Sequence, residues 1–320
     1  MTILVTGGAG FIGSHLVDRL LAEGRRVICF DTLDTIEKWE NVRTHIDNPL
    51  YKVVGGSISD IASLSKAFSC WGIDAVVHLA AQAGVRPLAQ DPCRHFNINA
   101  CGTVNVLEQC RQNAVAKIIY ASTSAVYGNN LTVPSKETDT TDSPLCVYAA
   151  SKKAGELACR AYHALYGMDV AVIRLFTVYG PRQRSAMAIP MFTRSIYDGK
   201  EIVLQGGIEV YRDFTYVADV VSGIMGILYT DHGYEIYNLG SGEITGLKTL
   251  ILALEERIGK KAITKRGPIG DGEATRTYAD ISKAREAFGY APKFGIYAGL
   301  DEYVKWFLED RKLEGRHVLP

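Results

Sequence analysis

Short apolar runs and helix-spaced apolar positions take turns along the first half of the chain. Each run has the length of one buried strand of a parallel sheet, and the runs are 3–6, 26–31, 51–54, 74–81, 117–121 and 170–175. Between them, apolar residues recur three and four positions apart, which predicts helices ending near residues 24 and 68 and spanning 92–112 and 148–166. This alternation is typical of an α/β fold with a doubly wound parallel sheet.

The alternation becomes irregular after residue 176. Helices are expected near 190–197, 220–229, 247–258, 281–288 and 298–311, and strands near 202–205, 211–217 and 234–239. Asp219 is the expected cap of the second of these helices. We therefore divide the chain into a sheet domain, 1–176, to which strand 234–239 returns, and a smaller mixed α/β domain, mainly 177–320.

Composition narrows the class of protein without identifying it. The 320 residues are 47% hydrophobic and 22% charged, with zero net charge, which gives no electrostatic footprint for nucleic acid. No apolar run reaches the length of a membrane span and no secretory signal is visible, so we expect a cytoplasmic protein without a membrane partner. The seven cysteines form no Cys-x-x-Cys pair, so we expect reduced thiols and no metal site.

A glycine triplet joins the first strand to the first helix. Gly7 suits a tight turn, Gly10 lets the backbone approach a pyrophosphate, and Gly13 lets the helix pack closely on the strand. The following strand ends in Asp31, which would accept hydrogen bonds from both ribose hydroxyls and repel a 2′-phosphate. Together these features predict a Rossmann domain that binds NAD in preference to NADP.

Polar residues with catalytic potential follow the later strands. Ser122 and Thr123 stand at the carboxyl end of strand 117–121, where ligands bind in such sheets. Tyr148 and Lys152 are one helical turn apart, and a cation near a phenol favours the phenolate. A phenol with an ordinary pKa of about 10 could then act as a base near neutral pH. His78, within an apolar strand, is interpreted as a core residue.

The combined motifs resemble the extended short-chain dehydrogenase/reductase family, which comprises nucleotide-sugar epimerases and dehydratases. The matching stretches are Gly-Gly-Ala-Gly-Phe-Ile-Gly at 7–13, His-Leu-Ala-Ala at 78–81, Asn99 before Gly102-Thr103, Ser-Thr-Ser-Ala-Val-Tyr-Gly at 122–128, Tyr-x-x-x-Lys at 148–152 and Arg-Asp-Phe-Thr-Tyr-Val at 212–217. The resemblance implies a catalytic trio of Thr123, Tyr148 and Lys152. It also implies a set of NAD contacts: Gly7, Gly10, Phe11, Ile12, Gly13, Asp31, Ser57, Ile58, Leu79, Ala80, Ala81, Gln82, Asn99, Ser122, Tyr148, Lys152 and Val178.

Two positions after the trio threonine separate the possible reactions. Dehydratases of the family carry Asp-Glu directly after it, and UDP-glucuronate decarboxylases carry Glu two positions on, whereas this chain has Ser124 and Ala125. The resemblance therefore implies simple 4-epimerisation. The runs 81–86 and 177–184 look most like UDP-glucuronate 4-epimerases, in which the last arginine of the second run, here Arg184, contacts the sugar carboxylate.

The resemblance implies further contacts with a UDP-sugar. Arg212 is expected to clamp the diphosphate, with Gln205 and Glu273 near uridine. The full expected set is Arg86, Thr123, Ser124, Ala125, Thr177, Arg184, Gln205, Arg212 and Glu273. Ser57 replaces the aspartate that usually contacts adenine, so NAD is expected to bind less tightly than in most of the family.

The sequence thus predicts an NAD-dependent UDP-glucuronate 4-epimerase. The alternatives are a 4-epimerase of UDP-glucose/UDP-galactose or of N-acetylated sugars, a net-oxidising dehydrogenase, and a non-enzymatic NAD-binding regulator. Helix 148–166 also carries a second apolar stripe of Ala150, Ala154, Leu157, Ala161 and Ala164. That stripe must be buried, and we expect a homodimer through the helices near 92–112 and 148–166. The alternative is burial by the chain's own C-terminal part.

Overall fold

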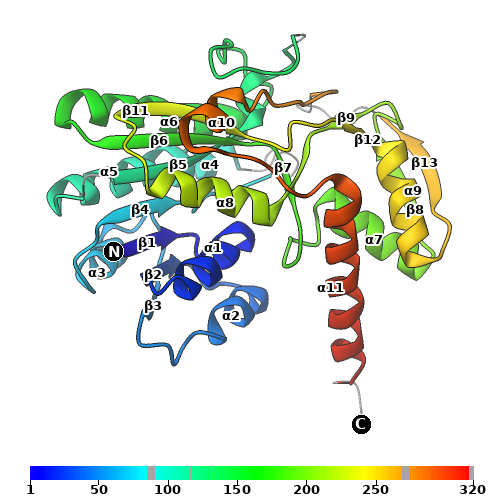
Figure 1. The fold of residues 1–320 in the computed structure, drawn as a ribbon, viewed down its shortest axis with the longest axis horizontal. Coiled ribbons are helices and arrows are strands. Elements are labelled where there is room, and N and C mark those ends of the chain that lie inside the picture. The colour runs from blue at the N-terminus through cyan, green and yellow to red at the C-terminus, as the bar shows by residue number, and fades with distance from the viewer. Residues whose placement is uncertain (85–90, 116, 131, 269–273, 317–320) are drawn as a thin grey trace.

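A twisted parallel sheet forms the centre of the molecule (Figure 1). The computed structural model describes residues 1–84, 91–115, 117–130, 132–268 and 274–316. Within these residues seven strands pair in the order β11-β6-β5-β4-β1-β2-β3. Their bounds are β1 Thr2–Thr6, β2 Arg26–Asp31, β3 Tyr51–Gly55, β4 Ala75–His78, β5 Lys117–Thr123, β6 Asp169–Leu175 and β11 Tyr234–Leu239. The predicted doubly wound parallel sheet is confirmed, and strand 234–239 does return to it, beside β6.

Helices cover both faces of this sheet because its strands are apolar on both sides. Successive side chains of a strand point to opposite faces, so Ile3 and Val5 enter one core while Leu4 enters the other. The first core is closed by α1 (Phe11–Ala22) and α8 (Val217–Leu228). The second is closed by α3 (Ile61–Phe68), α5 (Gly102–Gln112) and α6 (Val147–Tyr166). The short helices α2 (Ile36–Arg43) and α4 (Pro92–Phe96) lie in the connections.

The last part of the chain builds a smaller layer beside the sheet (Figure 1). There β8 (Glu201–Gln205) pairs in parallel with β13 (Ile263–Gly267), next to α7 (Ala188–Asp198), α9 (Leu247–Ile258) and α11 (Ile296–Arg316). Two short strand pairs join this layer to the sheet: β7 (Thr177–Tyr179) with β10 (Phe214–Tyr216), and β9 (Tyr211–Arg212) with β12 (Thr245–Gly246). Helix α10 (Ser282–Phe288) packs on β11.

Two expectations about this part of the chain need correction. Asp219 does not cap α8, because the helix begins at Val217, directly after β10. Its carboxylate instead accepts hydrogen bonds from the backbone N–H groups of Lys293 and Phe294, at 2.8 and 3.1 Å. Strand β13 was not expected, since most of its side chains are exposed and its sequence carries no apolar alternation. Pairing with β8 alone defines it.

The predicted helix over 92–112 is interrupted by a π-helical turn at Asn97–Cys101. Such turns widen a helix locally and are frequent at functional sites. Asn99, in the middle of the turn, thereby faces the segment that follows β4. Across the described ranges, no helix is both long and apolar enough to cross a membrane, and no group of His, Cys, Asp or Glu side chains is arranged to hold a metal ion.

Candidate active site

The order of the strands reverses between β1 and β4, which are neighbours in the sheet although two strands separate them in sequence. Crevices at such reversals are the usual ligand sites of open α/β sheets, at the carboxyl ends of the strands. Gly7 follows β1, Leu79 follows β4, and Thr123 ends β5. The predicted loops therefore meet at one edge of the sheet.

The glycine turn forms a cradle of backbone in which two of the glycines have no room for a side chain. Gly7 has φ +72°, and a Cβ there would lie 2.7 Å from the Ala80 nitrogen. A Cβ on Gly13 would lie 2.1 Å from the Gly7 carbonyl oxygen. Helix α1 starts from Gly10 without a side-chain cap, so the N–H groups of its first turn remain for an anion. This arrangement fits a dinucleotide pyrophosphate.

Asp31 lies beside this cradle, at the end of β2, as predicted. Its carboxylate is buried, accepts a 3.1 Å hydrogen bond from the Ala9 N–H, and forms a 2.9 Å ion pair with Lys38. The Ala9 contact fixes the carboxylate next to the phosphate-binding turn. A fixed acceptor at this distance from the turn suits the ribose of a dinucleotide.

The other predicted cofactor residues divide into two groups. One group is partly exposed at the edge of the sheet: Phe11, Ile12, Ser57, Leu79, Ala80, Ala81 and Gln82. The second group is buried and its side chains face the protein: Ile58, Asn99, Ser122 and Val178.

Two members of the buried group use their side chains for hydrogen bonds within the protein. Asn99 is 1% exposed, and its amide exchanges hydrogen bonds with the backbone of Gln82 and donates to the Ser151 hydroxyl. The Ser122 hydroxyl donates to the Glu156 carboxylate at 2.6 Å. Asn99 therefore shapes the cofactor edge through Gln82, and Ser122 shapes it through helix α6.

The predicted catalytic trio meets where β5 ends against α6. Thr123 and Tyr148 come from these two elements, and the Thr123 Oγ1 also accepts from the Ala125 N–H at 3.2 Å. In the chain alone burial raises the pKa of Tyr148, while the hydrogen bond with Thr123 and the charge of Arg184 lower it. The pKa of Tyr148 is raised overall, and Thr123 and Arg184 act against that rise.

Lys152 is almost completely buried one helical turn from Tyr148. Its ammonium nitrogen lies 4.4 Å from the centre of the Tyr120 ring, and burial lowers the pKa of Lys152 to about 7. Lys152 is not among the groups that shift the pKa of Tyr148, so the idea that its charge favours the phenolate stays a prediction. Burial favours the neutral form of both side chains.

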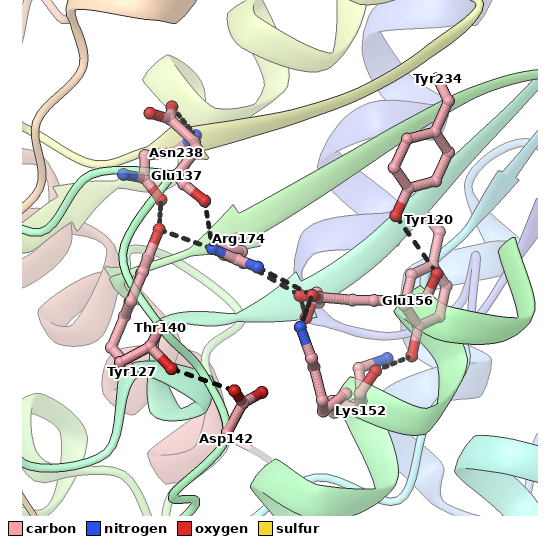
Figure 2. A network of polar contacts seen from close by, with 12 residues as sticks. Tyr120, Tyr127, Glu137, Thr140, Asp142, Lys152, Glu156, Arg174, Tyr234 and Asn238 are labelled. Atoms are coloured by element: carbon pink, nitrogen blue, oxygen red, sulfur yellow. Dashed lines mark hydrogen bonds and ion pairs between the residues drawn. The ribbon is translucent and has the colours of Figure 1, made fainter. Parts of the chain in front are cut away.

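A buried ion pair lies one helical turn after Lys152 (Figure 2). Arg174, on β6, contacts the Glu156 carboxylate of α6 through Nε at 3.0 Å and Nη2 at 2.9 Å. Arg174 is 2% exposed and Glu156 1%. Glu156 follows Lys152 by one turn, and its partner Ser122 precedes Thr123 in β5. The pair thereby joins the helix that carries Tyr148 and Lys152 to the strand that carries Thr123.

The same network extends to the segment after β5 (Figure 2). Arg174 also donates to the Tyr127 hydroxyl at 3.0 Å, and that hydroxyl donates to Asn238 at 2.7 Å. Sequence reasoning missed Glu156 and Arg174. A signal was present: Arg174 interrupts an otherwise apolar strand, and Glu156 is four positions after Lys152 on the same helix face.

The predicted sugar-binding residues come from several segments of the chain. Ser124 and Ala125 begin a 3₁₀ turn directly after Thr123. Neither residue carries a carboxylate. Arg184 is exposed and its Nη1 lies 3.5 Å from the Ala83 carbonyl oxygen. Thr177 begins β7 beside Phe214.

Strand β9 contains Arg212, and a second arginine lies beside this strand. Arg276 pairs with Tyr211 in an isolated bridge, and its guanidinium lies 5.2 Å from the centre of the Tyr211 ring. Arg276 also lines a small hollow with Ser124 and Tyr127. Sequence reasoning did not select Arg276, because it lies in a polar segment without a recognisable motif.

Three further predicted substrate contacts have no established place in the site. Gln205 ends β8 opposite Gly267, in the smaller layer. Arg86 and Glu273 lie outside the described residues.

Comparison with known proteins gives consistent matches along the chain. The model of the NAD dependent epimerase/dehydratase family matches residues 3–240. A UDP-glucuronate 4-epimerase of Thermodesulfobacterium geofontis is 39% identical over 317 residues, covering 97% of this chain and 97% of that protein.

Two solved structures of sugar-nucleotide epimerases are similar to this chain over almost its whole length, although they bind different sugars. The UDP-glucuronic acid 4-epimerase of Bacillus cereus, in complex with UDP-glucuronic acid and NAD, aligns with a TM-score of 0.90 at 33% identity, over 97% of this chain and 99% of that one. A UDP-glucose 4-epimerase of Thermotoga maritima, with UDP-glucose, aligns with a TM-score of 0.88, also at 33% identity, over 97% and 100%. Whole-chain similarity to these two is nearly equal, so the residues at the sugar decide between them.

Proposed function

Because the chain belongs to the NAD dependent epimerase/dehydratase family, we propose that it is a UDP-glucuronate 4-epimerase that interconverts UDP-glucuronate and UDP-galacturonate. The observation that carries the choice of sugar is the position of Arg184, which is exposed and lies against Ala83 in the segment that follows β4. The uronate carboxyl carbon is attached to C5, next to the reacting C4. A guanidinium at this edge of the sheet suits that carboxylate, because its planar fork matches the two carboxylate oxygens.

NAD fits the cradle formed by Gly7, Gly13, the start of α1 and Asp31. When bound, NAD supplies the acceptor for the hydride of C4 and the donor that returns it to the other face of the 4-keto sugar. The chain itself holds C4 of the sugar at the Tyr148 hydroxyl. At positions 124 and 125 it has no carboxylic acid that would promote a reaction of the 4-keto intermediate at C5.

Tyr148 handles the proton of the C4 hydroxyl. Burial raises the pKa of the Tyr148 phenol, and Thr123 and Arg184 act in the opposite direction. The ionised phenol accepts that proton as the ketone forms, and the phenol returns it to the C4 oxygen after the sugar has turned. Thr123, hydrogen-bonded at the phenol, supports the ionised form and can bond the same sugar oxygen. Ser124 and Ala125 offer no carboxylate for chemistry at C5, so reversal at C4 is the reaction that these residues support.

The diphosphate must stay anchored while the sugar turns. Arg212 lies in β9 and Arg276 lies beside it. Their two positive charges make this region the best candidate for the anchor of the diphosphate. Buried Asp213 follows Arg212 directly and connects β9 to the segment after Arg276. Its carboxylate accepts hydrogen bonds from the backbone N–H groups of Ser241, Gly242 and Ala279. The carboxylate of Asp213 thus fixes the strand that carries Arg212 and the segment that follows Arg276.

The proposed function is tested by proton NMR of UDP-glucuronate mixed with the purified chain, without added NAD. We expect UDP-galacturonate to accumulate to equilibrium with no net change at the nicotinamide absorbance band. Faster conversion of UDP-glucose in a parallel sample would favour the alternative sugar. Net formation of NADH would indicate a dehydrogenase, and binding of NAD without turnover of any sugar would indicate a regulator.

Replacing Arg184 with Ala should have two effects on UDP-glucuronate. The substrate should bind more weakly, by about tenfold or more for the loss of a charged contact. The 4-keto intermediate is a β-keto acid, so a carboxylate no longer held away from the carbonyl π-system should lose carbon dioxide, and NMR should show a UDP-pentose. The matched control is Arg19→Ala on the surface of α1. Unchanged affinity together with no additional pentose would contradict the role of Arg184.

A homodimer is part of the proposal. The outer face of α6 stays exposed in the chain, contrary to the alternative of burial by its own C-terminal part: Leu157, Leu165 and Tyr166 are 60%, 71% and 51% exposed. Phe96 and Val104, on α4 and α5, continue this apolar surface. A solution mass of twice 35.0 kDa is expected.

We propose a cytoplasmic location because all seven cysteines are free.

A further inference from the structure

The loop that carries Arg184 contains a strained residue. Arg182 has φ +65°, a left-handed conformation that is uncommon for residues other than glycine. Such conformations persist only where surrounding contacts hold them, and they cluster at functional sites. The conformation of Arg182 therefore requires a contact that stabilises it, and that contact fixes the direction of the chain two residues before Arg184.

The stabilising contact comes from the opposite end of the sequence. The Arg182 guanidinium forms an ion pair with Asp18 on α1 and donates to the His15 Nδ1 at 3.0 Å. Asp18 is itself held, since its second carboxylate oxygen is 2.7 Å from the His45 Nε2. Burial alone would raise the pKa of Asp18, but the hydrogen bonds and charge of His45 and Arg182 lower it overall.

His15 holds the neighbouring backbone as well. A guanidinium only donates, so the Nδ1 of His15 must accept and its ring proton must be on Nε2. That Nε2–H donates to the Pro181 carbonyl at 2.9 Å. Burial, with the nearby charge of Arg182, lowers the pKa of His15 to about 4, which keeps the ring in this neutral form. Two consecutive residues of the loop, Pro181 and Arg182, are thus tied to one face of α1.

The remaining residues of the loop leave it little freedom. Gly180 has φ +150°, and a Cβ there would lie 2.6 Å from Val217 Cγ1. Gln183 is buried, and its Nε2 donates to the Val178 carbonyl at 2.9 Å. Arg184 then emerges toward Ala83. With Gly180 and Gln183 fixed against the protein, the path of the chain into Arg184 depends on the turn at Arg182.

We propose that the Asp18–Arg182 pair is a positioning device for Arg184, which sets the affinity for the uronate carboxylate without touching the substrate. The inference rests on the proposed function, in which Arg184 binds that carboxylate. It makes Asp18 and Arg182 determinants of sugar specificity, although Asp18 is on the helix whose first turn serves the cofactor.

The test compares two constants in the full chain at saturating NAD: KM for UDP-glucuronate and the inhibition constant for UDP, which lacks the sugar. Asp18→Asn should raise KM about fivefold, as for the loss of a partly exposed ion pair, and leave the constant for UDP unchanged. Arg182→Ala should raise KM more than Arg182→Gly, because glycine adopts positive φ without strain. Arg19→Gln, which alters the same helix away from the loop, should change neither constant.

A double variant separates positioning from general stability. If Asp18 acts through Arg184, Asp18→Asn combined with Arg184→Ala should raise KM no further than Arg184→Ala alone. Additive effects, or an equal weakening of UDP binding in Asp18→Asn, would overturn the positioning role. If Arg184→Ala itself leaves KM unchanged, the proposed role of Arg184 has failed, and the NMR assay of the unmodified chain decides separately on the proposed function. If Arg184→Ala raises KM and Asp18→Asn does not, only the further inference has failed.

Discussion

Replacing Tyr148 with Phe should lower kcat for UDP-glucuronate by about a hundred- to ten-thousandfold, the usual contribution of a positioned general base. The change removes the hydroxyl that accepts and returns the C4 proton. It leaves the aromatic ring in place on α6. The KM should change little, because the proposed anchors of the substrate, Arg184, Arg212 and Arg276, are untouched. Epimer formation followed by NMR gives kcat and KM together.

The matched control is Tyr166→Phe, which removes an exposed hydroxyl from the last turn of the same helix. It should keep normal turnover. Urea unfolding should give the same midpoint for Tyr148→Phe as for the unmodified chain, which excludes a loss of structure as the cause. Turnover within threefold of normal in Tyr148→Phe would remove Tyr148 from the reaction.

Replacing Arg174 with Met should destabilise the fold by about 3 kcal/mol, since the buried Glu156 carboxylate would keep only the Ser122 hydroxyl and the Lys153 ammonium, the latter at 3.5 Å. The guanidinium also satisfies the Tyr127 hydroxyl and the Glu137 carbonyl, at 3.0 and 3.2 Å (Figure 2). The free energy of unfolding from urea titration measures the loss. Since Glu156 is on the helix of Tyr148 and Lys152, kcat of the folded fraction should fall as well.

Two variants show whether the lost partner is the cause. Arg174→Met combined with Glu156→Leu should be less destabilised than Arg174→Met alone, because no single charge remains buried. Arg160→Met removes an exposed guanidinium that lies 4.8 Å from the centre of the Tyr234 ring, and should cost about 0.5–1 kcal/mol. A double variant less stable than the single one would show that packing, not the unpaired carboxylate, dominates.

The sequence by itself determined the sheet, the cofactor turn and the reacting groups, because each leaves a local signal. Buried parallel strands are continuous apolar runs, and a glycine is required wherever a Cβ would collide, as at Gly13. Tyr148 and Lys152 share a helix face through spacing alone. These features could be predicted since the chemistry depends on neighbours in sequence or on the carboxyl ends of parallel strands.

Only the tertiary structure decided how the reacting groups are held and charged. Burial favours the neutral forms of Tyr148 and Lys152, an effect that depends on the atoms packed around them from other elements. Asn99 is taken up by Gln82 and Ser151, although its motif suggested direct contact with the cofactor.

The two ion pairs behind the site show the same limit most clearly. Glu156 meets Arg174 across 18 residues, and Asp18 meets Arg182 across 164. A local sequence pattern does not show which two residues will pair. The pairing depends on how α6 packs on the sheet and on how the loop of Arg182 packs on α1. The residues proposed to react could therefore be predicted from the sequence, and the residues proposed to hold them in position were found only in the fold.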